Sequence, residues 1–184
     1  MRHRPIPGSS GTVREMSLLG DPVLHAPCEP VTDFGPSLGR LVEDMFATMY
    51  AASGVGLAAN QIGVGLRVFV YDCPDDEDVR HIGHIVNPRL VSTDGVVVRG
   101  SEGCLSLPGL EAGTERYDEA VVEGVSVSGE PVRVSGTGFF ARCLQHEADH
   151  LEGLMYVDRL TGWRRRRLVR SAAKAGLSPT PPVT

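Results

Sequence analysis

A helical repeat of apolar residues is the clearest pattern in the chain. Seven apolar side chains recur at intervals of three and four residues: Leu38, Leu41, Val42, Met45, Phe46, Met49 and Tyr50. This spacing places them on one face of an α-helix. Ser37 is a candidate N-cap for that helix, and Gly54 is a candidate stop signal. The pattern predicts an amphipathic helix whose apolar face packs on a core.

Strand signals follow that helix. Runs of β-branched and aromatic residues occupy positions 68–71, 82–86, 90–92, 96–99, 120–128 and 130–135. Asp94-Gly95 and Ser128-Gly129 are predicted turns, and the acidic segment 73–78 is a predicted loop. Helical spacing returns at 140–151, where Gly153 is a stop signal, and in the basic segment 164–175. Antiparallel strands with segregated helices predict an α+β fold.

Composition narrows the class of protein. The chain has 184 residues, 41% hydrophobic and 22% charged, which is typical of one globular domain. We expect a flexible extension at 1–15, a single domain at 16–176 and a disordered tail at 177–184. A net charge of −5 argues against nucleic-acid binding by the body of the protein. No apolar run is long enough to span a membrane and none forms a secretory signal, so a cytoplasmic location is expected.

The candidate chemistry lies in His146-Glu147-Ala148-Asp149-His150, an HExxH pattern. Residues four apart share one face of a helix, so His146 and His150 can bind the same cation. Glu147 can then act as a base on metal-bound water without being a ligand itself. A third ligand is required, and the spacing leaves several candidates open: Cys28, Cys73, Cys104, Cys143, His81, His84 and the acidic side chains. Cys104 is notable because glycines flank its segment, 101–109.

Three segments resemble the motifs of bacterial peptide deformylases, in the family's order. Residues 54–61 (GVGLAANQ) resemble its motif GxGxAAxQ, residues 102–106 match EGCLS, and residues 146–150 match HExDH. The similarity extends over about residues 16–170. The resemblance implies antiparallel β-sheets around a central helix that carries the third motif, followed by a C-terminal helix.

The resemblance also implies a reaction and the residues that perform it. The reaction is hydrolysis of the N-formyl group from the initiator formyl-methionine of nascent polypeptides, which releases formate. Cys104, His146 and His150 would bind one divalent metal, Fe²⁺ by resemblance, although Zn²⁺, Ni²⁺ or Co²⁺ suit the same ligands. Metal-bound water would be the nucleophile and Glu147 the general acid/base, while Gln61 and the Leu105 N–H would stabilise the oxyanion. The implied substrate-binding residues are Gly54, Val55, Gly56, Gly100, Glu102, Gly103, Phe139, Arg142 and Cys143.

Parts of the sequence also fit other functions. Gly54, Gly56 and Ala59 also fit a dinucleotide-binding pattern, but that motif must follow a strand, and this segment follows a helix. An HExxH peptidase would cleave internal peptide bonds without requiring a formyl group. A structural metal site would need four protein ligands, whereas three are evident, which favours an open catalytic site. The basic segment Arg164–Arg170 is either a solvated helix face or a docking helix for ribosomal RNA.

Overall fold

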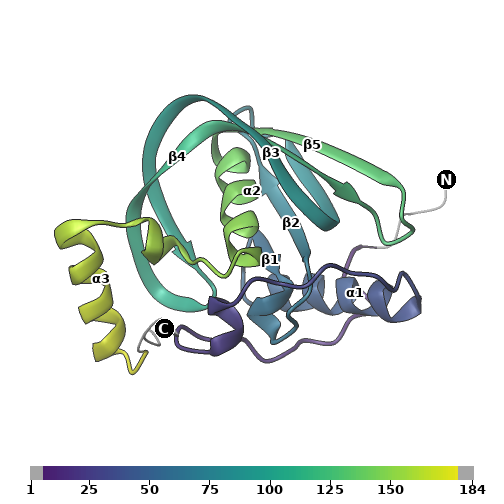
Figure 1. The fold of residues 1–184 in the computed structure, drawn as a ribbon, viewed down its shortest axis with the longest axis horizontal. Helices are drawn as coiled ribbons and strands as arrows, with labels where there is room; N and C mark the ends of the chain where they lie inside the picture. The colour runs from purple at the N-terminus through teal and green to yellow at the C-terminus, as the bar shows by residue number, and fades with distance from the viewer. Residues whose placement is uncertain (1–5, 178–184) are drawn as a thin grey trace.

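One antiparallel sheet curves around a central helix in the computed structural model, which describes residues 6–177 (Figure 1). The strands lie in the order β1-β2-β3-β4-β5. They are β1 (Gly56–Ala58), β2 (Val68–Pro74), β3 (Arg80–Cys104), β4 (Leu107–Val125) and β5 (Pro131–Thr137). The helices are α1 (Pro36–Ala51), α2 (Gly138–Leu151) and α3 (Gly162–Lys174), with 3-10 turns η1 (Pro22–His25), η2 (Ala59–Ile62) and η3 (Tyr156–Arg159). The predicted α+β class is confirmed.

The β3–β4 ribbon is much longer than the predicted strands. The predicted turn at Asp94-Gly95 is wrong, because Asp94 pairs with Glu119 and β3 continues past it. A register shift follows between Asp94 and Val97, and Gly95 has a φ of +77°. A β-bulge uses a left-handed glycine as a tight turn does, so the dipeptide gives the same signal for both. The predicted loop at 73–78 is also too long, since β2 extends to Pro74. The turn at Ser128-Gly129 is confirmed between β4 and β5.

Helix α1 packs its predicted apolar face against the sheet. It begins at Pro36 with Gly35 as N-cap, so the prediction of Ser37 as N-cap is wrong. Proline at the first helical position has its φ preset and lacks an N–H that would have no partner there. The helix buries Leu38, Val42, Met45, Phe46, Thr48 and Met49. With β1 and β2, this face forms one of the core clusters.

Helix α2 is buried on nearly all sides. Eleven of its 14 residues are buried, and β1, β2, β3, β4 and β5 all contact it. Phe140, Leu144 and Leu151 fix the helix in the core with β2, β4 and β5. The HExxH residues on the same helix are therefore held in the interior, beside the end of β3 that carries Cys104.

The N-terminal segment lies along α1. The backbone N–H of Gly8 and the hydroxyl of Ser10 donate to Glu43 (3.0 and 2.8 Å), and the N–H of Thr12 donates to Asp44 (2.8 Å). The expected flexibility of residues 1–15 and the domain bounds stay predictions, and residues 1–5 and 178–184 lie outside the described part. Within the described part, no helix is long and apolar enough to cross a membrane.

Candidate metal centre and active site

Three potential ligand atoms converge where α2 meets the end of β3. The Nε2 atoms of His146 and His150 lie 3.1 Å apart, and Cys104 Sγ lies 3.2 Å from Nε2 of His150. All three atoms lie within 4.8 Å of one another. Ligands about 2.1 Å from a tetrahedral ion are roughly 3.4 Å apart, so the spacing suits one ion. Among the described residues, this trio is the one group of His, Cys, Asp and Glu side chains with such a geometry.

The surroundings of the two histidines suit metal binding. His146 Nδ1 lies 2.7 Å from Glu102 Oε1, which directs the Nε2 lone pair toward Cys104 and His150. A carboxylate partner of this kind orients histidine ligands in metal sites. Burial lowers the pKa of His150 well below its ordinary value, so its imidazole stays neutral, as a ligand must be. Burial also acts to lower the pKa of His146, but its hydrogen bonds with Cys104 and Glu102 raise that pKa well above the ordinary value, so an ion bound there would displace a proton. The donor set of one thiol and two imidazoles fits Zn²⁺, Fe²⁺, Co²⁺ or Ni²⁺.

Glu147 lies beside this trio in the protein interior. Its side chain is buried, and its Oε2 has no hydrogen-bond partner among the described residues. Burial raises the pKa of Glu147 to about 7. A carboxyl group with that pKa can both accept and return a proton near neutral pH. Gly56 on β1 gives it room, because a Cβ there would lie 2.4 Å from Glu147 Oε1.

The Glu102 carboxylate is held ionised in the interior. Burial acts to raise its pKa, but hydrogen bonds from His146 and Arg116 keep that pKa well below its usual range. Arg116 donates to both carboxylate oxygens (3.1 and 2.7 Å), and Arg142 donates to one of them (2.9 Å). A buried charge is stable only with such pairing.

Gln61 approaches the trio from η2. Its Oε1 accepts a hydrogen bond from the Ala58 N–H (2.9 Å), which fixes the orientation of the side-chain amide. The Nε2 atom then lies 3.4 Å from Cys104 Sγ and 3.2 Å from Ser106 Oγ. Gln61 and Leu105, the residue after Cys104, line one common cleft. The Gln61 amide nitrogen is thus held within hydrogen-bond distance of one of the three candidate ligand atoms.

A cleft of about 630 Å³ opens onto these groups. The structure brings most of the sequence-predicted site residues to its lining: Gly54, Val55, Gly56, Gln61, Glu102, Gly103, Cys104, Leu105, Phe139, Arg142, Cys143, His146 and Glu147. His150 lies beneath the cleft and is fully buried. Gly100 lies behind Arg142, whose guanidinium would be 2.9 Å from a Cβ at that position, so its predicted place in a substrate pocket stays a prediction.

Sequence reasoning missed part of the site. Ala52, Ser53, Ser101, Leu107, Pro108, Gly109, Leu110 and Glu111 also line the cleft. Asp149 and Arg116, which lie behind it, form an ion pair at 2.6 Å. The third motif contains Asp149, but nothing along the chain predicts that Arg116 would be its partner.

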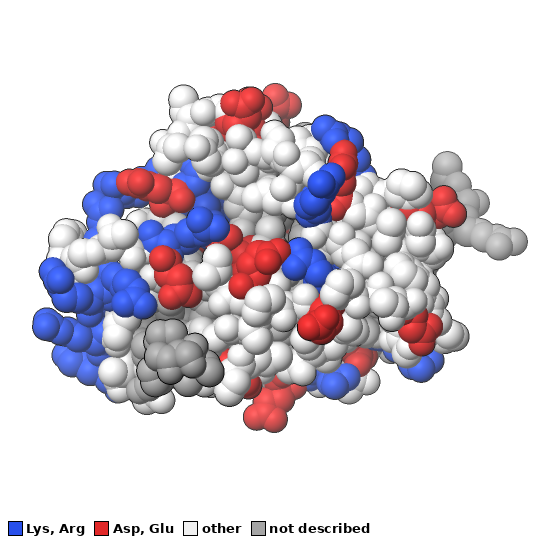
Figure 2. Space-filling view, viewed as in Figure 1, with Lys and Arg blue, Asp and Glu red and all other residues white. Residues whose placement is uncertain are grey.

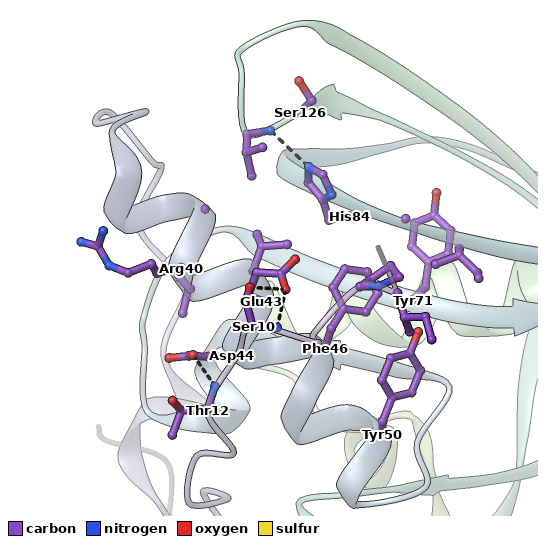
Figure 3. Close-up of a pocket in the computed structure, with 18 of the residues that line it drawn as sticks. Ser10, Thr12, Arg40, Glu43, Asp44, Phe46, Tyr50, Tyr71, His84 and Ser126 are labelled. Carbon is purple, nitrogen blue, oxygen red and sulfur yellow. Dashed lines mark hydrogen bonds between the residues drawn. The ribbon is translucent and has the colours of Figure 1, made fainter. Parts of the chain in front are cut away.

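A larger groove, about 1670 Å³, lies between the N-terminal segment, α1 and the sheet. Figure 3 shows Ser10 and Thr12 bonded to Glu43 and Asp44 at its edge. His84 in this groove accepts a hydrogen bond from the Val127 N–H (3.2 Å). Glu43 and Asp44 in this groove are therefore already hydrogen-bonded within the chain. The candidate ligand atoms lie at the smaller cleft instead.

The class of protein that fits this site is the metal-dependent hydrolases. The chain has an α+β fold, an enclosed helix with the HExxH pattern and a cysteine as third candidate ligand. Residues 13–166 match the polypeptide deformylase family. The chain is 78% identical over 175 residues to peptide deformylase 2 of Streptomyces avermitilis, covering 95% of this chain and 94% of that protein. The chain therefore belongs to the polypeptide deformylase family.

Solved structures agree with this assignment. A peptide deformylase from Legionella pneumophila is 41% identical, with a TM-score of 0.81 over 90% of this chain and 96% of that one. One from Synechococcus elongatus, in complex with actinonin, is 34% identical, with a TM-score of 0.81 over 92% of each chain. The predicted function is confirmed at this level: the chain is a metal-dependent enzyme that removes the N-formyl group from nascent polypeptides.

Proposed function

We propose that Cys104, His146 and His150 hold one divalent ion and that Glu147 is the general acid/base of deformylation. The main support is the position of the buried Glu147 carboxyl beside the three converging candidate ligand atoms. One of its oxygens has no hydrogen-bond partner among the described residues. When bound, the ion would supply Lewis-acid polarisation of the formyl oxygen and would acidify water. Fe²⁺ is the physiological ion in this proposal.

The remaining steps use side-chain and backbone groups that line this cleft. Glu147 takes a proton from the attacking water, because its carboxyl titrates near neutrality and faces the cleft. The Gln61 amide and the Leu105 N–H donate to the oxygen that gains negative charge, and losing one such donor costs about 3 kcal/mol of barrier. Glu147 then returns the proton to the departing amine.

Selection for a formyl group follows from the two glycines at the cleft. A Cβ at Gly54 would lie 2.6 Å from Leu105 Cδ1, so the backbone approaches Leu105 closely there. The backbone at Gly56 approaches Glu147 and Cys143 just as closely. In this proposal the two close approaches narrow the cleft beside Glu147, so that a one-carbon acyl group fits better than a larger one. In this proposal the methionine side chain of the substrate lies near Val55, Phe139 and Cys143. The other proposed substrate-binding residues are Gly100, Arg142, Glu102 and Gly103.

The test compares Glu147→Gln with the unsubstituted chain. Both proteins are loaded anaerobically with Fe²⁺, and formate release from a formyl-methionyl tripeptide is followed while the peptide mass is monitored. We expect equal metal content, rapid formate release by the unsubstituted chain and loss of turnover by at least about 100-fold in Glu147→Gln. Turnover that survives the substitution would refute the role of Glu147, and internal cleavage would favour a peptidase.

We also propose that α3 docks on the ribosome and that the enzyme works in the cytoplasm. Its basic side chains gather at one end of the molecule (Figure 2). Arg165, Arg166, Arg167, Arg170 and Lys174 are exposed, while Leu168 and Ala172 pack inward. Replacing Arg165, Arg166 and Arg167 with Gln should weaken salt-sensitive ribosome binding and leave tripeptide turnover unchanged. Unaltered ribosome affinity would refute the docking role.

A further inference from the structure

A chain of ionic hydrogen bonds runs from the surface to a proposed metal ligand. Arg159 in η3 donates to both oxygens of Asp149, with Nε 2.9 Å from Oδ2. The same Oδ2 accepts from Arg116 Nη1 at 2.6 Å. Arg116 bonds Glu102 through two nitrogens, and Glu102 is the partner of His146 Nδ1. Four contacts thus connect η3 with an imidazole of the candidate metal centre.

Only the outer member of this chain reaches solvent. The side chains of Arg116 and Glu102 are each 4% exposed and that of Asp149 is 7% exposed, whereas that of Arg159 is 49% exposed. Buried carboxylates need charged partners to remain ionised. Asp149 has two guanidinium partners, and its orientation depends on both. Without Arg159, the Asp149 carboxylate would keep Arg116 as its side-chain partner, and its Oδ1 would lose the partner that it has among the described residues.

The network touches the surroundings of all three proposed ligands. Asp149 directly precedes His150 on α2. Glu102 bonds His146 and lies two residues before Cys104 on β3. A displacement of Asp149 is therefore transmitted to the last turn of α2 and, through Arg116, to the end of β3. Since η3 precedes α3 along the chain, Arg159 also joins the C-terminal segment to the site.

We propose that Arg159 is a positioning residue for the metal centre: its bidentate bond to Asp149 holds the Arg116–Glu102–His146 network in the geometry that retains the ion. The inference rests on the proposed metal site and extends it to a residue outside the cleft. Lysine cannot form two parallel bonds to one carboxylate, so the role requires arginine.

Arg67 provides a matched control. Its guanidinium bonds the Glu152 carboxylate (2.8 Å) and the Leu151 carbonyl (3.4 Å) at the same end of α2, and the Pro88 carbonyl of β3 (3.0 Å). Within the described residues, it makes none of the contacts of the Asp149–Glu102 network. Replacing Arg67 with Gln removes one positive charge and the bonds that join the end of α2 to β3, and it leaves the Asp149–Glu102 network intact.

The experiment measures metal retention rather than turnover. The unsubstituted chain, Arg159→Gln, Arg159→Lys and Arg67→Gln are loaded with Co²⁺, and its release into excess chelator is followed by visible absorption. Release should be about tenfold faster in Arg159→Gln, the lower end of the affinity loss caused by removing a direct partner of a metal ligand, and intermediate in Arg159→Lys. Arg67→Gln should release Co²⁺ as the unsubstituted chain does. Melting temperatures of the metal-free proteins are recorded in parallel.

Two outcomes overturn the inference. Equal release rates in Arg159→Gln and the unsubstituted chain would show that Asp149 is held without Arg159. Acceleration in both Arg159→Gln and Arg67→Gln, in proportion to their losses of melting temperature, would show a general structural effect. Failure of the proposed function is distinct, because the unsubstituted chain would then bind no Co²⁺ or release no formate.

Discussion

Replacing Gly56 with Ala tests how closely β1 approaches Glu147, the proposed general acid/base. The added Cβ would lie 2.4 Å from Glu147 Oε1 and 2.9 Å from Cys143 Sγ. Ordinary contact begins at 3.4 Å, so β1 and Glu147 must separate by about 1 Å. A displacement of this size in a reacting group costs about 100-fold in rate, or roughly 2.7 kcal/mol of barrier. We therefore expect kcat/KM for formate release to fall about 100-fold in Gly56→Ala.

Two other glycines calibrate the result. A Cβ at Gly39 in α1 would meet no described atom within 4 Å, so Gly39→Ala should leave kcat/KM unchanged and stabilise the fold by about 0.5–1 kcal/mol. In Gly54→Ala, the added Cβ would lie 2.6 Å from the end of the flexible Leu105 side chain. We expect a fall in kcat/KM between those of Gly39→Ala and Gly56→Ala. Formate release is measured at matched metal content. Unchanged kcat/KM in fully loaded Gly56→Ala would refute the reasoning that Gly56 makes room for Glu147.

Three further predictions concern stability and the metal. Burial and the hydrogen bond to Asp72 raise the pKa of Tyr50 to about 12, so the stability this phenol contributes is present below pH 10 and is lost as the pH rises toward 12. Urea unfolding of Tyr50→Phe should therefore show less alkaline loss of stability than the unsubstituted chain, and equal losses would contradict this. Arg116→Met should lower the free energy of unfolding by about 3–5 kcal/mol, because Glu102 and Asp149 lose a buried partner; denaturant titration measures it, and a change below about 1 kcal/mol would contradict it. Chelation should abolish formate release and lower the melting temperature, and added Co²⁺ should restore both; a fully active metal-free protein would refute the metal requirement.

The local part of the site could be predicted from the sequence. Helical geometry alone places His146 and His150 on one face of α2, and that placement needs no tertiary information. The third candidate ligand atom is Sγ of Cys104, which lies at the end of a 25-residue strand, and no spacing rule predicts where such a strand ends. The resemblance to a known family was needed to select Cys104 from the other cysteines and histidines.

The errors in the predicted fold have a common physical source. A glycine with positive φ serves equally in a turn and in a bulge, so Asp94-Gly95 could not distinguish a hairpin from a continuous curved strand. Long-range pairing decides between them, because β3 continues to find partners on β4 after residue 94. Ion pairs such as Arg116 with Asp149 depend on the same pairing and leave no local pattern.

The burial of α2 connects its fold to its chemistry. On a helix enclosed on nearly all sides, polar side chains need hydrogen-bond partners within the protein. Gln145 bonds the backbone of Tyr117, Arg142 and His146 bond Glu102, and Asp149 bonds two arginines. On this helix, the buried side-chain atoms without a partner in the described structure are Glu147 Oε2 and His150 Nδ1. Of the two residues, only Glu147 lines the cleft. The residue proposed as general acid/base is therefore also one that carries a buried polar atom for which the fold supplies no partner among the described residues.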